Sequence, residues 1–184
     1  SVIVLLIQLG KMENLFSNMN NVCNAVFLDR DGVLNKLKYD YVKSIDELDI
    51  FSFIPKPIKK IHSLGFLVIV VTNQSAINRG FTSHQKISEI HEKIQSFLKS
   101  FGTKVDAFYY CPHMPNESCM CRKPKPGLLF KASDDWNIDL KSSWFIGDSE
   151  SDIIAGNSAG CKTIKISQNF NLENAVQKLE NFLI

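Results

Sequence analysis

The chain has 184 residues, of which 45% are hydrophobic, and its formal net charge is +2. This length allows one domain with a substantial buried core, so no second domain is needed. The near-neutral charge, without a block of Lys or Arg, gives no electrostatic reason to expect a nucleic acid or an anionic membrane as a partner. The opening SVIVLLIQLG is apolar but too short to span a bilayer. We expect an N-terminal extension over residues 1–20 and the folded domain over residues 21–184.

Apolar runs alternate with helical patterns along the rest of the chain. Residues 25–29 and 66–73 are continuous apolar runs, typical of parallel strands that are covered by helices on both faces. Further strands are expected at 107–111, 144–148 and 161–166, and helices at 55–65, 82–102, 126–136, 151–160 and near the C-terminus. This order predicts an α/β fold with a mainly parallel central sheet and no insertion long enough for a large cap domain.

Two details of the helices can also be predicted. Thr82 followed by Gln85 indicates a capping box at the start of helix 82–102, and Gly102 indicates its end. Apolar residues of the C-terminal helix recur at helical spacing and are expected to face the core: Leu172, Ala175, Val176, Leu179, Phe182 and Leu183.

Acidic and polar residues follow several of the predicted strands. Asp29 and Asp31 follow the first strand, Thr72–Gln74 end the second, and Asp148 ends the strand at 144–148. Because ligands bind beyond the carboxyl ends of parallel strands, these residues are expected to share one site. Converging carboxylates repel one another unless a cation intervenes, and oxygen ligands of this kind suit Mg2+. Taken singly, each aspartate is explained more simply as a turn or helix-cap residue.

Three of the five cysteines lie in the stretch CPHMPNESCMCRKPKPG, residues 111–127. Cys111, His113, Cys119 and Cys121 offer three thiolates and one imidazole, a ligand set typical of tetrahedral Zn2+. Unmetallated thiols are the alternative, since free cysteines are often simply buried. The odd, clustered cysteines do not fit a secreted disulfide scaffold, so we expect a reducing, cytoplasmic location.

Four segments occur in an ordered set: DRDG, VVTNQ, RKPKPG and GDSESD. With this set the chain, from Ala25 to about Ile166, resembles the phosphatases of the haloacid dehalogenase superfamily, which implies their three-layer, Rossmann-like fold. The resemblance implies that Asp29 is the nucleophile and forms an aspartyl phosphate, and that Asp31 is the general acid and base. It also implies catalytic Mg2+ held by Asp29, Asp148 and the backbone carbonyl of Asp31.

The same resemblance gives roles to two further residues. Thr72 and Lys123 are implied to stabilise the transferring phosphoryl group. Asp152 is implied either to support the metal through water or to hold Lys123 in place. Considered alone, Thr72 is explained as an ordinary strand residue and Lys123 as a solvated surface charge.

A longer set of segments, FLDRDGVLN, VVTNQSAINRGF, YYCPH, CMCRKPKPG and GDSESDIIAG, resembles one subfamily. These are the D-glycero-D-manno-heptose 1,7-bisphosphate 7-phosphatases, whose nearest relatives are the histidinol-phosphate phosphatases. In both groups the zinc loop is structural. The resemblance implies that the substrate is contacted by Thr72, Asn73, Gln74, Ser75, Arg122 and Lys123.

The resemblance therefore predicts a Mg2+-dependent phosphoric monoester hydrolase of a small phosphorylated sugar. The most specific expectation is removal of the 7-phosphate of heptose 1,7-bisphosphate, in the synthesis of nucleotide-activated heptose for lipopolysaccharide or other surface polysaccharide. Histidinol-phosphate phosphatase, in histidine biosynthesis, is the alternative enzyme. A polynucleotide 3′-phosphatase shares the first motifs but has no reason to carry the zinc loop. A zinc-stabilised binding domain with vestigial acids is the non-enzymatic alternative. We expect a monomer with neither nucleic acid nor membrane as a partner.

Overall fold

The computed structural model describes residues 22–183, so the predicted extension over residues 1–20 lies outside the described part of the chain. Within the described residues, five strands form one parallel sheet in the order β3-β2-β1-β4-β5. The strands are β1 (Asn24–Leu28), β2 (Phe66–Asn73), β3 (Ala107–Cys111), β4 (Trp144–Gly147) and β5 (Lys162–Lys165). Each predicted strand is found within a residue or two of its expected bounds.

Helices connect the strands, as the alternating pattern predicts. They are α2 (Pro55–Ser63), α3 (His84–Ser100), α4 (Gly127–Trp136), α5 (Glu150–Ala159) and α6 (Leu172–Leu183). Two short 3-10 helices, η1 (Ile45–Glu47) and η2 (Leu140–Ser142), lie in the connections. The predicted α/β class is therefore confirmed.

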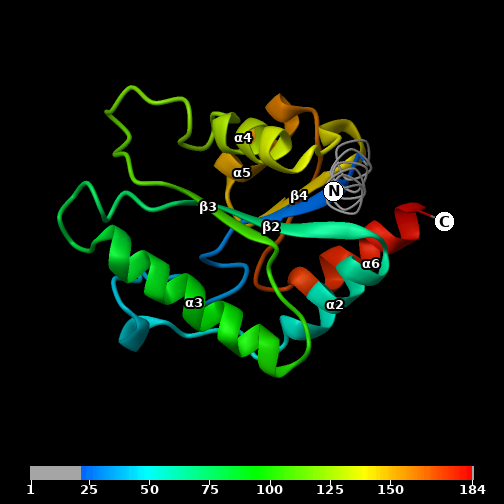
Figure 1. The fold of residues 1–184 in the computed structure, drawn as a ribbon, viewed down its shortest axis with the longest axis horizontal. Coiled ribbons are helices and arrows are strands. Elements are labelled where there is room, and N and C mark those ends of the chain that lie inside the picture. Colours follow the sequence, from blue (N-terminus) through cyan, green and yellow to red (C-terminus); the bar gives the residue numbers. More distant parts are fainter. Residues whose placement is uncertain (1–21, 184) are drawn as a thin grey trace, which may run out of the picture.

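The sheet is the middle of three layers, with α4 and α5 on one face and α2, α3 and α6 on the other (Figure 1). Side chains of β1 alternate between the two faces, as they must in an extended strand. Val26 and Leu28 belong to the core formed with α2, α3 and α6, while Ala25 and Phe27 belong to the core formed with α4 and α5. Because both faces are buried, the strand is apolar from Ala25 to Leu28.

Loops, and no cap domain, surround the carboxyl edge of the sheet in residues 22–183. The connection from β1 to α2 contains no element longer than η1. The connection from β3 to α4, residues 112–126, contains most of the cysteine-rich stretch. The absence of a large cap agrees with the prediction.

The predicted cap of α3 is wrong by one residue. Ser83 is the N-cap, and its side chain accepts a hydrogen bond from the Lys86 N–H. The Thr82 hydroxyl instead donates to the Lys43 carbonyl at 2.7 Å. Thr82 thus ties the start of α3 to the loop that follows β1, a tertiary contact with no local sequence signal.

The inward placement of the last two apolar residues of α6 is also wrong. Phe182 and Leu183 are 63% and 47% exposed, whereas the first three turns of the helix place Leu172, Ala175 and Leu179 in the core. The final turn extends past the end of the sheet (Figure 1). The Phe182 ring lies edge-on to Trp144, with 5.2 Å between ring centroids. No helix in the described part of the chain is both long enough and apolar enough to cross a bilayer.

Candidate active site and metal centre

The candidate site lies where β1 ends, between its two neighbours in the sheet. Leu28, the last residue of β1, pairs with Val70 of β2 on one side and Ile146 of β4 on the other. Asp29 therefore leaves the sheet beside Asp148, which follows β4. From β1 the chain proceeds to β2 and β3 on one side of the sheet, and it then crosses to β4 and β5 on the other side. The end of β1 is therefore the topological switch point, where ligands bind in open α/β sheets.

Three carboxylates meet at this point. Ligand oxygens of Asp29, Asp148 and Asp152 all lie within 4.8 Å of one another. Burial raises the pKa of Asp29 to about 7, with Lys123 acting in the opposite direction. Burial also raises the pKa of Asp148, and the neighbouring Asp152 adds to that rise. A buried divalent cation with oxygen ligands would relieve this repulsion, so the donor set fits Mg2+.

Lys123 places a single positive charge between two of these acids. Its Nζ lies 2.9 Å from Asp29 Oδ1 and 2.7 Å from Asp152 Oδ1, and it donates to the Val71 carbonyl at 2.8 Å. Although burial acts to lower the pKa of Lys123, Asp29 and Asp152 together raise it. The side chain is only 2% exposed, so Lys123 is a buried cation at the site and not a solvated surface charge.

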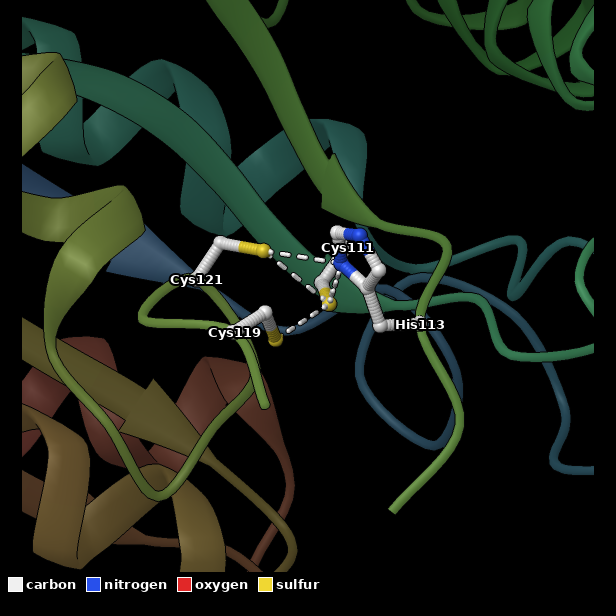
Figure 2. A group of neighbouring side chains, drawn as sticks. All are labelled: Cys111, His113, Cys119 and Cys121. Carbon is white, nitrogen blue, oxygen red and sulfur yellow. Dashed lines mark hydrogen bonds between the residues drawn. The ribbon is translucent and has the colours of Figure 1, made fainter. Parts of the chain in front are cut away.

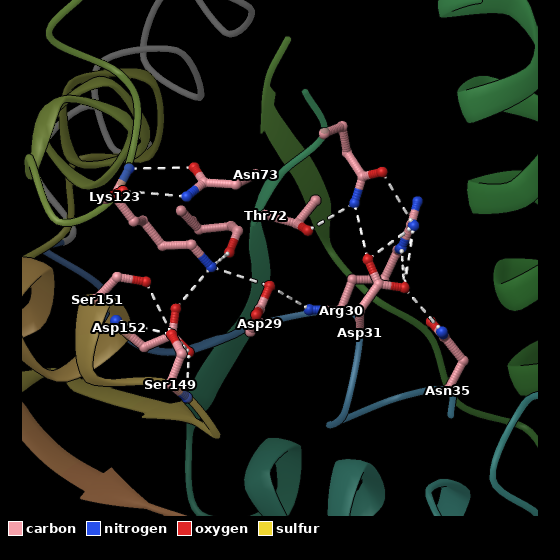
Figure 3. Close-up of polar contacts among 12 residues, drawn as sticks. Asp29, Arg30, Asp31, Asn35, Thr72, Asn73, Lys123, Ser149, Ser151 and Asp152 are labelled. Atoms are coloured by element: carbon pink, nitrogen blue, oxygen red, sulfur yellow. Dashed lines mark hydrogen bonds and ion pairs between the residues drawn. The ribbon is translucent and has the colours of Figure 1, made fainter. Parts of the chain in front are cut away.

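Asn73 fixes the backbone from which Lys123 extends. The Asn73 side chain accepts from the Lys123 N–H at 3.1 Å and donates to the Lys123 carbonyl at 3.1 Å (Figure 3). Because both polar atoms of one amide bind one residue, this pair sets the position and the direction of the lysine stem. Asn73, at the end of β2, thereby joins the sheet to the loop that carries Lys123.

Asp152 has a local and a long-range role at once. It is the third residue of α5, where its Oδ2 accepts from the N–H and the hydroxyl of Ser149 at 3.0 and 2.8 Å. Its Oδ1 pairs with Lys123. The helix-cap explanation for this aspartate is therefore correct, and the cap also orients the carboxylate toward the lysine.

Gly32 makes room for Asp148. Its φ is +83°, and a Cβ at this position would lie 2.1 Å from Asp148 Oδ2. Any other residue would combine a left-handed backbone with a direct collision against a candidate metal ligand. The glycine of DRDG is therefore part of the acid cluster's geometry.

The Asp31 side chain lies apart from the acid cluster, against Arg30 and Asn35 (Figure 3). Arg30 Nη2 lies 3.0 and 2.9 Å from its two oxygens, and Asn35 Nδ2 and Gln74 Nε2 donate at 2.8 and 2.9 Å. Burial favours the neutral acid, but Arg30 and these amides outweigh it and lower the pKa of Asp31. The arrangement therefore holds Asp31 as an ionised carboxylate. Because the Asp31 side chain is held by these donors, the backbone carbonyl of Asp31 is the group expected to face Mg2+.

The remaining candidate substrate residues come from the end of β2 and from the cysteine-rich loop. Thr72 and Gln74 are 1% exposed and Ser75 is 4% exposed, at the end of β2 and just beyond it. Arg122 Nη1 donates to the His113 carbonyl at 3.0 Å, so its guanidinium is held against the cysteine-rich loop. The structure thus brings the Thr72–Ser75 segment and Lys123 to one edge of the sheet.

The four candidate zinc ligands point toward one another (Figure 2). Cys111 Sγ lies 3.8 Å from Cys119 Sγ and 3.2 Å from Cys121 Sγ. His113 Nδ1 lies 3.4 Å from Cys111 Sγ and 3.2 Å from Cys121 Sγ. Sulfur atoms around tetrahedral Zn2+ are separated by about 3.8 Å, given Zn–S bonds of about 2.3 Å. The cluster therefore has the size and the donor set of a closed structural zinc site.

Two side chains at the site were not predicted from the sequence. Arg30 and Asn35 lie in the loop after the first strand and are fully buried against Asp31. A charged residue directly between two aspartates in DRDG was the available signal for Arg30. Asn35 had none, because its contact depends on how the loop folds back.

The fold and the acids at its strand ends define a phosphatase of the haloacid dehalogenase class, and comparison with known proteins gives the family. The model of the family described as polynucleotide kinase 3 phosphatase matches residues 24–180. The chain therefore belongs to that family, a group of phosphoric monoester hydrolases.

The names of individual relatives are more specific than the description of the family. The chain is 40% identical to the D-glycero-beta-D-manno-heptose-1,7-bisphosphate 7-phosphatase of Haemophilus ducreyi, over 76% of this chain and 80% of that protein. It is 37% identical to the corresponding alpha-anomer enzyme of Photorhabdus laumondii, over 77% and 80%. The crystal structure of the D,D-heptose 1,7-bisphosphate phosphatase of B. bronchiseptica, complexed with magnesium and phosphate, matches with a TM-score of 0.79 and 28% identity. That match covers 86% of this chain and 99% of the other.

Proposed function

We propose that this protein removes the 7-phosphate of D-glycero-D-manno-heptose 1,7-bisphosphate, in the synthesis of nucleotide-activated heptose for surface polysaccharide. The observation that carries the proposal is that the residues brought together at the site suit the activity for which the relatives are named. Asp29, Asp148 and Lys123 meet at the sheet edge, and relatives that are 40% identical are named as phosphatases of this substrate.

In the first half-reaction, a carboxylate oxygen of Asp29 attacks the 7-phosphorus and the bond from phosphorus to the C7 oxygen breaks. Lys123 neutralises charge on Asp29 and on the phosphoryl group, and the Thr72 hydroxyl donates to a phosphoryl oxygen. The leaving alkoxide takes a proton from Asp31. The donors around Asp31 favour its ionised form. Asp31 can therefore carry the proton for this step only when at least one of these donors breaks its hydrogen bond to the carboxylate.

In the second half-reaction, water attacks the phosphorus of the aspartyl phosphate and gives a proton to Asp31. The bond from phosphorus to Asp29 breaks, releasing inorganic phosphate, and the ionised Asp31 of the structure is the form needed for this base step. Asp29, Asp148 and the Asp31 carbonyl would hold Mg2+, which when bound supplies charge neutralisation for the approach of carboxylate to phosphate.

The cysteine-rich loop has a structural part in this proposal. Cys111, His113, Cys119 and Cys121 would bind Zn2+ with all four positions filled, which leaves none open for chemistry. Cys121 is followed directly by Arg122 and Lys123. The loop would therefore present Arg122 to a substrate phosphate and fix the start of the Lys123 segment. Ser75, just beyond β2, and Thr72 and Asn73, at the end of that strand, would complete the substrate contacts.

The cysteine-rich loop also supports a compartment. Cys111, Cys119, Cys121 and Cys161 form no disulfide, and a cluster of thiols remains reduced in the cytoplasm but not in an oxidising space. We therefore propose a cytoplasmic, monomeric enzyme acting on a small sugar phosphate. Gel filtration with light scattering tests the oligomeric state.

A substrate panel tests the proposed function. Purified protein with Mg2+ is assayed for phosphate release from both anomers of heptose 1,7-bisphosphate, histidinol phosphate, fructose 1,6-bisphosphate and a 3′-phosphorylated oligonucleotide. We expect a heptose bisphosphate to give the highest kcat/KM, and Asp29→Asn to abolish it. The highest value with histidinol phosphate or with the oligonucleotide would assign the alternative function, and equal values throughout would contradict the specific assignment. If the wild type released phosphate from none of these substrates, the non-enzymatic alternative, a zinc-stabilised binding domain with vestigial acids, would be the remaining explanation.

A further inference from the structure

We propose that Gln74 is a positioning residue that holds two catalytic groups at once, the Thr72 hydroxyl and the Asp31 carboxylate, and that Arg30 fixes it in that role. This inference rests on the proposed function, because it assigns Gln74 a part in the chemistry of the same site. It differs from the substrate contact that the family resemblance implies for Gln74.

The geometry joins four side chains into one network. Gln74 Nε2 donates to Thr72 Oγ1 at 2.9 Å and to Asp31 Oδ2 at 2.9 Å. Arg30 Nη2 donates to Gln74 Oε1 at 3.1 Å and also to both oxygens of Asp31. Gln74 thus links β2 to the loop after β1, and it does so through the two residues whose positions matter for proton and phosphoryl transfer.

The neighbours of Gln74 leave only one orientation for its amide. A guanidinium only donates hydrogen bonds, so the oxygen of the amide must face Arg30. An ionised carboxylate only accepts, so the NH2 group must face Asp31. Exchanging the two amide atoms would place donor against donor and acceptor against acceptor in a buried site, which is costly.

This orientation also constrains the hydroxyl hydrogen of Thr72. Because Thr72 Oγ1 accepts from Gln74, its own hydrogen must be directed elsewhere. No acceptor for that hydrogen is found among the hydrogen bonds of residues 22–183. The hydroxyl is therefore left as a donor for a ligand oxygen, which is the role a phosphoryl group requires.

The hydrogen bonds that Gln74 already makes within the protein separate this role from direct recognition of the sugar. The Gln74 side chain is 1% exposed and Arg30 is fully buried. All the polar atoms of the Gln74 amide are used by protein partners.

The test compares Gln74→Met with a matched control, Gln95→Met. Gln95 also makes two amide bonds, to the N–H and the carbonyl of Val105, but it lies on α3 away from the acids. With Mg2+ and p-nitrophenyl phosphate, we expect Gln74→Met to lower kcat about 100-fold with KM changed less than about threefold. Gln95→Met is expected to lower the melting temperature while kcat stays within about twofold of the wild type.

Two further measurements keep the result interpretable. If Gln74→Met does not fold, Gln74→Glu keeps an oxygen for Arg30 but loses the donors, and the same loss of kcat is expected. In an Asp29→Asn background, the Kd for the heptose bisphosphate is expected to change less than about twofold when Gln74→Met is added. A Kd weakened tenfold or more would establish a substrate contact and overturn the inference.

The inference and the proposed function can fail separately. An active wild type with an unchanged kcat in a folded Gln74 variant would overturn the inference alone. Turnover of p-nitrophenyl phosphate without turnover of heptose bisphosphate would overturn the proposed substrate while the comparison of the glutamine variants still stands. A wild type inactive on every monoester would overturn both.

Discussion

Lys123 Nζ lies 2.9 Å from Asp29 Oδ1, although the two residues belong to different loops on different strands. Asp29 follows the central strand β1, and Lys123 is in the connection after β3, at the edge of the sheet. Asn73 bridges the gap by binding the Lys123 backbone from β2. The distance between Asp29, the proposed nucleophile, and Lys123 therefore depends on how the cysteine-rich loop is anchored.

Replacing Lys123 with methionine should separate chemistry from zinc binding. The substitution removes the cation from two buried acids, so we expect kcat to fall at least about 1000-fold and the free energy of unfolding to fall by about 3 kcal/mol. Steady-state kinetics and urea denaturation measure the two effects. Zinc content, measured by mass spectrometry, should stay at one ion per chain.

Lys131→Met is the control for Lys123→Met, because Lys131 forms an exposed pair with Asp135 on α4. We expect it to change the free energy of unfolding by less than about 0.5 kcal/mol and to leave kcat unchanged. Activity near the wild-type level in Lys123→Met would contradict the electrostatic role of the lysine.

Disrupting the zinc cluster should weaken substrate binding and turnover together. Cys119→Ser removes one of the four proposed zinc ligands, so we expect loss of bound zinc, a lower melting temperature and a joint rise in KM and fall in kcat. Cys23→Ser, outside the cluster, should retain both zinc and activity. Full activity in a zinc-free Cys119→Ser protein would show that the metal does not position Arg122 and Lys123.

Gly32→Ala and Gly65→Ala form a matched pair. Both glycines have positive φ, +83° and +84°, but only at Gly32 does a Cβ meet another group, Asp148 Oδ2 at 2.1 Å. Each substitution should cost about 1–2 kcal/mol of stability from backbone strain. Only Gly32→Ala should also weaken the activation of phosphatase activity by Mg2+, measured by titrating the metal. Equal metal dependence in the two variants would argue against Asp148 as a ligand.

Asp106 should contribute acid-sensitive stability far from the active site. Burial acts to raise its pKa, but bonds from His62, the Val68 N–H and Lys104 lower it to about 2. Since the folded-state pKa lies below the usual value of about 3.9, the contribution is fully present above about pH 4 and is lost as the pH falls toward 2. Asp106→Asn should therefore reduce the free energy of unfolding at pH 7 by about 1–2 kcal/mol, allowing for solvent screening.

Urea denaturation at pH 7 and pH 2.5 checks this prediction for Asp106. The difference between the wild type and Asp106→Asn should shrink at the lower pH. Asp134→Asn, at an exposed position on α4, is the control and should change stability by less than about 0.5 kcal/mol. A difference that is constant with pH would mean that the charge of Asp106 is not what stabilises the fold.

The order of elements and the location of the site could be predicted from the sequence because both depend on local signals. Strands buried on both faces are apolar throughout, and the residues that follow them must meet at the carboxyl edge. The cap at Ser83 and the contact of Thr82 with Lys43 were not predicted, because Thr82 is followed by Gln85 as in a capping box, whereas Ser83 is followed by Lys86. Only tertiary packing favours Ser83 over Thr82.

Side-chain partners within the site were the least predictable part. DRDG places Asp29 and Asp31 two residues apart, but their carboxylates face different surroundings. The Asp29 carboxylate pairs with Lys123, whereas the Asp31 carboxylate pairs with Arg30. Nothing in the spacing of the motif indicates that separation. It follows from the turn at Gly32 and from Gln74, which reaches Asp31 from the neighbouring strand.

The most direct test of the account is to locate the covalent intermediate. The protein is mixed with excess substrate and Mg2+, quenched in acid within milliseconds, reduced with borohydride and digested for mass spectrometry. Reduction converts an aspartyl phosphate to homoserine, so we predict homoserine at position 29 and at no other aspartate. Homoserine at another position, or none in protein quenched during active turnover, would contradict the assignment of Asp29 as the nucleophile.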